Sequence, residues 1–243
     1  MQRPVVSRDE WITARKALLL KEKQLTRQRD QLAAERRKLP WVKVDKAYVF
    51  DGSNGKETLA DLFDGRSQLV IQHFMFGPDW EEGCVGCSFG ADHVDSARQH
   101  FEHRDLSFAA VSRTSVAKIE SFKRRMGWRF KWVSSFDSDF NYDFGVSFTR
   151  EQLAGGEVVY NYGPIESQME DLSGISLFYK DETGSIFHTY STYARGDELL
   201  STAYAYLDLA PKGRDEEGLP FPSAWWRHHD KYEDEGLKAK KIG

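Results

Sequence analysis

Two apolar runs separated by one helical segment restrict most strongly the folds that this chain can adopt. The runs are LVIQHFMF (69–76) and LSFAAVSR (106–113), and each is apolar enough to be a buried strand. Residues 85–104, between them, carry apolar side chains roughly along one side of a helix. A strand, a helix and a second strand in this order join through a right-handed crossover. The segment therefore predicts the centre of a layered α/β domain.

Strands and helices continue to alternate along the chain. Further strands are predicted at 42–50 and 130–135 and as a hairpin at 175–191, and further helices at 115–127 and 197–209. This order predicts an α/β three-layer sandwich, in which helices cover both faces of a mixed sheet.

Residues 7–39 precede this pattern and predict one long helix. Ser7 followed by Glu10 forms a capping box at its start, and Pro40 marks its end. Apolar residues recur at every seventh position: Trp11, Leu18, Leu25, Leu32 and Leu39. The second heptad row is mostly polar, so we do not expect an isolated coiled coil. We expect an arm that lies on its own domain or on the partner subunit of a homodimer.

The chain is thus expected to have three parts. They are an N-terminal helical arm (1–40), an α/β domain (41–210) and a C-terminal tail (211–243). The tail is polar and carries clustered aromatic residues in FPSAWWRHHDKY.

Composition limits the classes of partner and the cellular location that we expect. The net charge is −4, so nothing attracts the chain as a whole to nucleic acid. No run of about 18 apolar residues is present, so we expect no membrane span. The first residues, MQRPVVSRDEW, lack the apolar core of a signal peptide, and we expect a cytoplasmic location. A structural disulfide is unusual there, so a pair of close cysteines is expected to be catalytic or metal-binding.

The only two cysteines, Cys84 and Cys87, form a Cys-x-x-Cys directly after the first buried strand. A cysteine at a helix start faces unpaired N–H groups, which favour the nucleophilic thiolate, and a second one three positions on lies on the same side. We therefore expect Cys84 to attack a disulfide and Cys87 to resolve it. A metal site would need two more ligands. The following His93 lies about 240° around a continuous helix from Cys87, pointing away. An inert, buried pair is the third alternative.

The neighbours of the pair suggest a substrate site. Gly83 and Gly86 would let a partner's backbone approach the sulfur. Trp80 would shield the thiols and offer an apolar contact, with simple packing as the alternative. The acidic residues of 79–82 oppose the helix dipole, so we expect a pKa of roughly 7 to 8 for Cys84. Arg195 follows the hairpin at a strand-to-helix junction, where small ligands often bind, with a surface ion pair as the alternative.

Several stretches carry a family resemblance. LADLFDGRSQLVIQHFMFGPDWEEGCVGC is similar to the opening of thioredoxin-like and peroxiredoxin-like proteins. GCVGCSFGADHVD, LFYKDETGSIFHTYSTYARG and YAYLDLAPKGRDE resemble the bacterial thioredoxin-like family called domain of unknown function 899, over about residues 10–230. The resemblance implies a thioredoxin-like fold, in its peroxiredoxin-like variant, and a dithiol–disulfide oxidoreductase activity with a redox-active disulfide.

Two positions depart from the related folds. Ile175 or Ser176 stands where thioredoxins carry a cis-proline opposite the cysteines. Glu81 stands where peroxiredoxins carry a Thr or Ser three residues before the reactive cysteine. The expected function is therefore a thiol–disulfide oxidoreductase acting on a protein or small-molecule disulfide, with neither cofactor nor metal. A thiol peroxidase using Cys84 and a non-catalytic binding protein are the alternatives. The expected substrate-binding residues are Trp80, Gly83, Gly86, Ile175, Ser176 and Arg195.

Overall fold

The computed structural model describes residues 3–232, which divide into two compact units on either side of the Trp41–Val42 bond. The first unit contains helix α1 (Arg8–Arg36). The predicted capping box is confirmed: the Ser7 hydroxyl accepts from the Glu10 N–H, and the Glu10 carboxylate accepts from the Ser7 N–H at 2.9 Å. No residue of α1 is buried. The docking of this arm stays a prediction.

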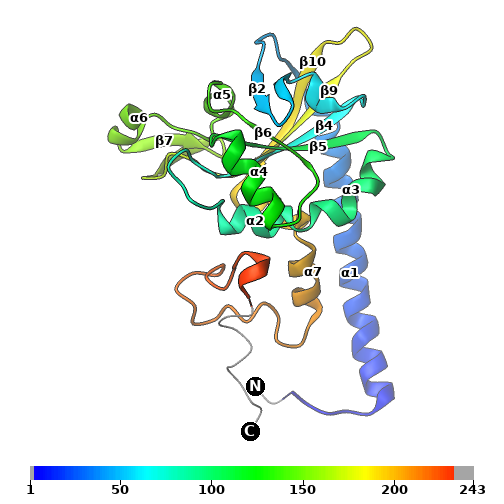
Figure 1. The fold of residues 1–243 in the computed structure, drawn as a ribbon. Coiled ribbons are helices and arrows are strands. Elements are labelled where there is room, and N and C mark those ends of the chain that lie inside the picture. Colours follow the sequence, from blue (N-terminus) through cyan, green and yellow to red (C-terminus); the bar gives the residue numbers. More distant parts are fainter. Residues whose placement is uncertain (1–2, 233–243) are drawn as a thin grey trace. The chain divides into compact units, whose positions relative to one another are not determined.

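The second unit is built on one eight-stranded mixed sheet (Figure 1). Its strand order is β1-β10-β9-β4-β5-β6-β2-β3. The bounds are β1 (Val42–Lys43), β2 (Val49–Gly52), β3 (Gly55–Thr58), β4 (Gln68–His73), β5 (Leu106–Ser112), β6 (Lys131–Ser134), β9 (Gly174–Lys180) and β10 (Ile186–Tyr193). A separate hairpin consists of β7 (Glu157–Tyr160) and β8 (Gly163–Glu166).

The directions of the four central strands define the fold. β4 and β5 are parallel, whereas β9 pairs antiparallel with β4 and β10 antiparallel with β9. The order β10-β9-β4-β5, with a helical crossover from β4 to β5, is the strand order of the thioredoxin fold. The predicted fold is therefore confirmed, and β1, β6, β2 and β3 extend the sheet at its two edges.

Helices cover both faces of this sheet. Their bounds are α2 (Val85–Ala91), α3 (Val94–Glu102), α4 (Val116–Arg125), α5 (Phe140–Asp143), α6 (Arg150–Ala154) and α7 (Thr202–Leu209), with 3-10 turns η1 (Asp61–Phe63), η2 (Ala194–Leu200) and η3 (His229–Lys231). One buried cluster joins α2 and α4 to the sheet, and another joins η1 and α5 to it. Successive side chains of a strand point to opposite faces, so each sheet face contributes to one cluster only.

One predicted strand, and the segment that follows it, differ from the expected pattern. The predicted strand 42–50 is divided into β1, the edge strand beside β10, and β2, which lies near the other edge between β6 and β3. The following DGSNGKET is a β-hairpin, with Gly55 at φ 120° in its turn. Regular alternation does not reveal that the chain crosses from one edge to the other, and this crossing was missed.

Two predicted helices are interrupted. The predicted helix 85–104 breaks at Asp92 and His93 into α2 and α3, and the Asp92 carboxylate accepts from the Trp128 indole at 2.8 Å. The predicted helix 197–209 is η2 followed by α7, separated at Ser201 by extended backbone. Within residues 3–232, none of the helices has the length and apolar character needed to cross a membrane.

Candidate active site

The loop between β4 and α2 places Cys84 at the start of a helix. The Cys84 N–H donates to the Met75 carbonyl at 2.9 Å, and its own carbonyl accepts from the Ser88 N–H at 2.9 Å. Lys118 of α4 holds the loop by donating to the carbonyls of Pro78 (3.0 Å) and Trp80 (2.8 Å). The reactive segment is thus fixed at both ends and in its middle.

Cys84 and Cys87 are free thiols that line the same pocket and interact with each other. Cys87 is 5% exposed, and its sulfur accepts from the Met75 N–H at 3.4 Å, whereas Cys84 is partly exposed. A hydrogen bond from the Cys87 thiol, joined by those from the backbone N–H groups of Cys87 and Gly86, lowers the pKa of Cys84 to about 6 against the opposing effect of burial. The same thiol–thiol contact, and then burial, raises the pKa of Cys87.

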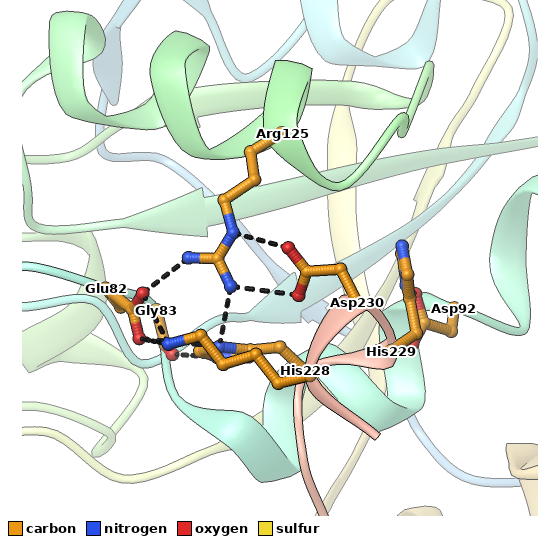
Figure 2. A network of polar contacts seen from close by, with 8 residues as sticks. Glu82, Gly83, Asp92, Arg125, His228, His229 and Asp230 are labelled. Atoms are coloured by element: carbon orange, nitrogen blue, oxygen red, sulfur yellow. Dashed lines mark hydrogen bonds and ion pairs between the residues drawn. The ribbon is translucent and has the colours of Figure 1, made fainter. Parts of the chain in front are cut away.

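The pKa of Cys84 is lower than the 7 to 8 expected from the acidic approach loop. Glu82 explains part of the difference, because its carboxylate is paired with Arg125 (Figure 2). It is also paired with Lys231 at 2.8 Å. These two cations compensate the charge that was expected to oppose thiolate formation.

The segment 225–232 is here called the C-terminal strap. It packs against the loop between β4 and α2 (residues 74–84), here called the cysteine loop. The Trp226 ring stacks on Phe89 of α2 with centroids 4.8 Å apart and an interplanar angle of 11°. The His228 ring is 3% exposed and contacts the Gly83 carbonyl through Nε2 at 2.9 Å (Figure 2). His229 contacts Asp92 at 2.7 Å. The strap therefore covers both the loop and the helix that carry the thiols. Residues 233–243 of the predicted tail lie outside the described residues.

A pocket of about 570 Å³ opens beside the two thiols. Both cysteines contribute to its wall, together with β4, β5, β9, α3, η2, α7 and Trp226. Most of its lining is apolar, including Val70, Phe101, Leu106, Phe108, Ile175 and Leu177. Its size lies within the range of small-molecule sites.

Several polar side chains line this pocket, among them Gln72, His93 and Asp197. Gln72 is 7% exposed; its Nε2 donates to the Cys87 carbonyl at 3.0 Å, and its Oε1 has no hydrogen-bond partner in the described part of the chain. His93 Nε2 is likewise buried without a partner among residues 3–232, and burial lowers its pKa. Burial raises the pKa of Asp197 to about 6. His93 was expected to point away from Cys87 on one continuous helix, but the helix breaks at Asp92 and His93, and both His93 and Cys87 line the pocket.

The sequence of residues 1–232 matches the family described as "Bacterial protein of unknown function (DUF899)". The chain belongs to this family. No curated protein matches the sequence.

Solved structures similar to this DUF899 protein include Xanthomonas campestris peroxiredoxin Q (16% identity, 69% of this chain and 96% of that chain, TM-score 0.42). Another is the peroxidoxin BcpB of Mycobacterium tuberculosis (17% identity, 69% and 97%, TM-score 0.43). A third is a variant of Xylella fastidiosa PrxQ (18% identity, 67% and 89%, TM-score 0.41).

The pocket brings together three of the six residues expected to bind substrate in this DUF899 protein. Gly86, Ile175 and Arg195 line it with the cysteines. Arg195 stands at its rim: its side chain is 83% exposed and pairs with Glu198 at 2.7 Å. The pocket therefore reaches solvent at this arginine.

The two glycines make room for the protein's own aromatic rings. A Cβ at Gly83 would lie 2.6 Å from the Phe74 ring, and one at Gly86 would lie 2.8 Å from the Trp226 ring. Trp80 is partly buried against the core cluster on the α4 face. Trp80 and Gly83 do not line the pocket.

Ser176 lies on the opposite face of the sheet from the pocket. Its hydroxyl contacts His73 Nε2 at 2.8 Å and the Ser191 hydroxyl at 2.8 Å. The Ser191 hydroxyl in turn contacts His188 Nε2 at 2.7 Å. His73 is 1% exposed, and burial lowers its pKa to about 3. Ile175 and Ser176 were equivalent candidates in sequence, but neighbouring strand residues face opposite sides and only Ile175 reaches the pocket.

Sequence reasoning missed Gln72, Asp197 and Trp226 among other residues of the pocket. Gln72 had a signal, because it is a polar residue inside the apolar run LVIQHFMF. Asp197 and Trp226 had none that places them near the thiols. In the part of the chain that the structure describes, no cluster of His, Cys, Asp or Glu is arranged to hold a metal ion.

Proposed function

We propose that this protein is a thiol–disulfide oxidoreductase in which Cys84 is the attacking residue and Cys87 the resolving residue. The supporting observation is that both thiols line one pocket, Cys84 partly exposed and Cys87 buried, and that their interaction moves their pKa values in opposite directions. At neutral pH one sulfur is then mostly thiolate, while its neighbour keeps its proton. This is the division of labour that a two-step exchange needs.

In the proposed reaction the Cys84 thiolate attacks one sulfur of a substrate disulfide, an S–S bond forms to Cys84, and the substrate S–S bond breaks. The departing thiolate takes a proton, leaving as a thiol. Cys87 then gives up its proton to solvent and attacks the Cys84 sulfur, which releases the second substrate half as a thiol once protonated. The protein dithiol is oxidised to a disulfide, the substrate is reduced, and an external dithiol restores the starting state.

The surroundings support the order of these steps. Cys87 is buried behind Cys84, so an entering disulfide reaches Cys84 first. Nearby negative charge on Asp197 contributes to the raised pKa of Cys87, which delays its ionisation. Once Cys84 is covalently bound and uncharged, the largest influence that holds the Cys87 proton is gone. Resolution is thereby coupled to attack.

A protein or small-molecule disulfide is the proposed partner class, without cofactor. We include a cytoplasmic location in the proposal, because a reducing compartment would keep the cysteine pair in the reduced form from which this reaction starts. The proposal extends to a homodimer, in which the arm lies on its own domain or on the partner subunit.

Alkylation at limiting iodoacetamide, followed by peptide mapping over a pH series, tests the role division. We expect Cys84 to be labelled first, with a midpoint near pH 6, and mild oxidation to join both cysteines in one disulfide. Faster labelling of Cys87 would reverse the roles. Slow labelling of both, without disulfide formation, would exclude the redox function.

Two matched variants complete the test. Cys87→Ser should accumulate a mixed disulfide with substrate, whereas Cys84→Ser should not. Rapid oxidation of Cys84 by hydrogen peroxide, without exchange with any disulfide, would instead favour the thiol peroxidase. Inertness of both thiols, with no effect of Cys84→Ser on any phenotype, would favour the non-catalytic binding protein.

A further inference from the structure

The pocket beside the thiols is larger than disulfide exchange at a surface would require. A protein disulfide needs only an exposed sulfur, whereas this pocket of about 570 Å³ extends from Cys84 along β4, β5 and β9 beneath α3. Its wall is formed mainly by aliphatic and aromatic side chains. Burying apolar ligand surface against this wall is favourable, because it removes that surface from water. The pocket therefore favours an apolar organic group directly next to the reactive sulfur.

Gln72 gives this apolar pocket one specific polar feature. Its side chain is 7% exposed, and the Nε2 donor is already used by the Cys87 carbonyl at 3.0 Å. The other end of the amide, Oε1, is buried and has no partner within residues 3–232. A buried acceptor without a donor costs free energy, which a ligand N–H or O–H would recover. The unmade hydrogen bond therefore points to a ligand with a donor near its sulfur.

Charge at the pocket restricts the ligand further. Asp197 has a pKa of about 6 and is mostly ionised at neutral pH. Glu198, at the rim, has a lowered pKa because Arg195 and Arg214 pair with it. Those two arginines are thus already occupied, and the ionised carboxylate of Asp197 repels anions. An anionic disulfide such as glutathione disulfide would have to bury its carboxylates beside it.

We propose that the pocket binds one organic half of an uncharged, low-molecular-weight disulfide, with an apolar body in the pocket and a hydrogen-bond donor directed at Gln72. This inference rests on the proposed function and names the substrate class of the same site. Cys84 attacks the sulfur attached to the bound half, the S–S bond breaks, and the other half leaves as a thiol. Cys87 then releases the bound half.

Binding is tested without thiol chemistry by two probes that lack sulfur. 1,2-Diphenylethane replaces the S–S of diphenyl disulfide by CH₂–CH₂, and benzanilide places an amide N–H at the same position. Calorimetry on the full chain should show that both bind and that benzanilide binds about five- to tenfold more tightly. In Gln72→Leu the two affinities should become equal. Absence of binding by both probes would overturn the proposal while leaving the proposed function intact.

Reactivity is tested with two chromogenic aromatic disulfides, one neutral and one dianionic. They are 4,4′-dithiodipyridine and 5,5′-dithiobis(2-nitrobenzoate), and each rate with the protein is divided by the rate with free cysteine. We expect the neutral probe to be favoured at least about tenfold, as about 1.4 kcal/mol of charge discrimination gives. Equal normalised rates would overturn the charge argument. Probe binding without reaction of either disulfide would remove the substrate assignment together with the proposed function.

A pocket-blocking variant links the two measurements. Ala97 lies on the exposed side of α3 and lines the pocket, so Ala97→Trp should abolish probe binding and slow the neutral disulfide without disturbing the core. Ala117→Trp, at an exposed alanine of α4 outside the pocket, is the matched control and should change neither. Unchanged neutral-disulfide rates in Ala97→Trp would overturn the proposal. Oxidation of Cys84 by cumene hydroperoxide outpacing its reaction with the neutral disulfide would overturn it in favour of an apolar hydroperoxide.

Discussion

Arg125 of α4 binds Asp230 of the C-terminal strap through two parallel contacts, Nε to Oδ2 at 2.7 Å and Nη2 to Oδ1 at 2.9 Å. The same guanidinium contacts Glu82 in the cysteine loop and Nδ1 of His228 (Figure 2). One side chain of α4 therefore joins the strap to the loop that precedes Cys84.

Loss of this arginine should release the strap. We expect Arg125→Ala to increase the rate at which a protease cuts within residues 225–232, because a bidentate ion pair and a contact to the loop are lost together. Limited proteolysis with mass mapping measures the effect. The neighbouring exposed Arg124→Ala is the control and should behave as the native chain. Equal cutting rates in the two variants would show that the strap is held by its aromatic rings alone.

Removing the Cys87 thiol should raise the pKa of Cys84. Cys87→Ala deletes the largest influence that lowers it, so the pH midpoint of Cys84 alkylation should rise by about one unit or more. Cys87→Ser keeps a donor at the same place and should shift the midpoint less. The rates of iodoacetamide labelling at several pH values give the pH midpoint of Cys84 alkylation in each variant. A midpoint that stays in place in both variants would assign the effect to the backbone N–H groups.

Asp197 should make the fold less stable as the pH rises. Its pKa is raised in the folded chain to about 6 from 3.8, so the folded state holds a proton that the unfolded state releases. Its stabilising contribution is complete below about pH 4 and is lost as the pH rises through 6. Asp197→Asn should therefore gain stability over the native chain between these pH values, reaching on the order of 1–2 kcal/mol at neutral pH. Urea unfolding at a series of pH values measures it, and a pH-independent difference would contradict the assignment.

Gly86 and Trp226 should be energetically coupled. Gly86→Ala places a methyl group 2.8 Å from the Trp226 ring and should destabilise the native chain. Trp226→Ala alone should cost about 2–4 kcal/mol through lost packing on Phe89. In the double variant the clash is absent, so the two effects should fall short of their sum by about 1–2 kcal/mol. Additive values would mean that the strap moves aside at no cost.

Deletion of residues 1–40 should promote aggregation. The apolar side chains at every seventh position of α1 form one narrow stripe, and we expect it to be covered by the domain or by a second copy in solution. Light scattering on heating compares the truncated and full chains. A truncated protein that is as heat-stable and as dispersed as the full chain would contradict the predicted docking.

The parts of the fold that follow from local chemistry were predictable from the sequence. The apolar runs of β4 and β5 and the Ser7–Glu10 box each depend on residues close together in the chain. The break between α2 and α3 at Asp92 could not be predicted, because Asp92 is held by Trp128 and His229 from distant segments. The Cys84–Cys87 pair was proposed from its spacing, its place between a buried strand and a helix, and the family resemblance. The pocket could not be predicted from the sequence, because its walls meet only after β9, η2 and the strap are in place.

The serine bridge between His73 and His188 couples the tautomers of two rings that never touch. Burial lowers the pKa of His188, and a hydrogen bond with the backbone of Tyr190 partly opposes this shift. When His188 accepts at Nε2 from Ser191, Ser191 accepts from Ser176 and Ser176 accepts from Nε2–H of His73. The relay has a single polarity, and reversing one hydroxyl would require reversing all the others. It would also leave the partnerless His73 Nδ1 carrying a buried proton. The two imidazoles therefore behave as one unit, with opposite tautomers fixed at its two ends.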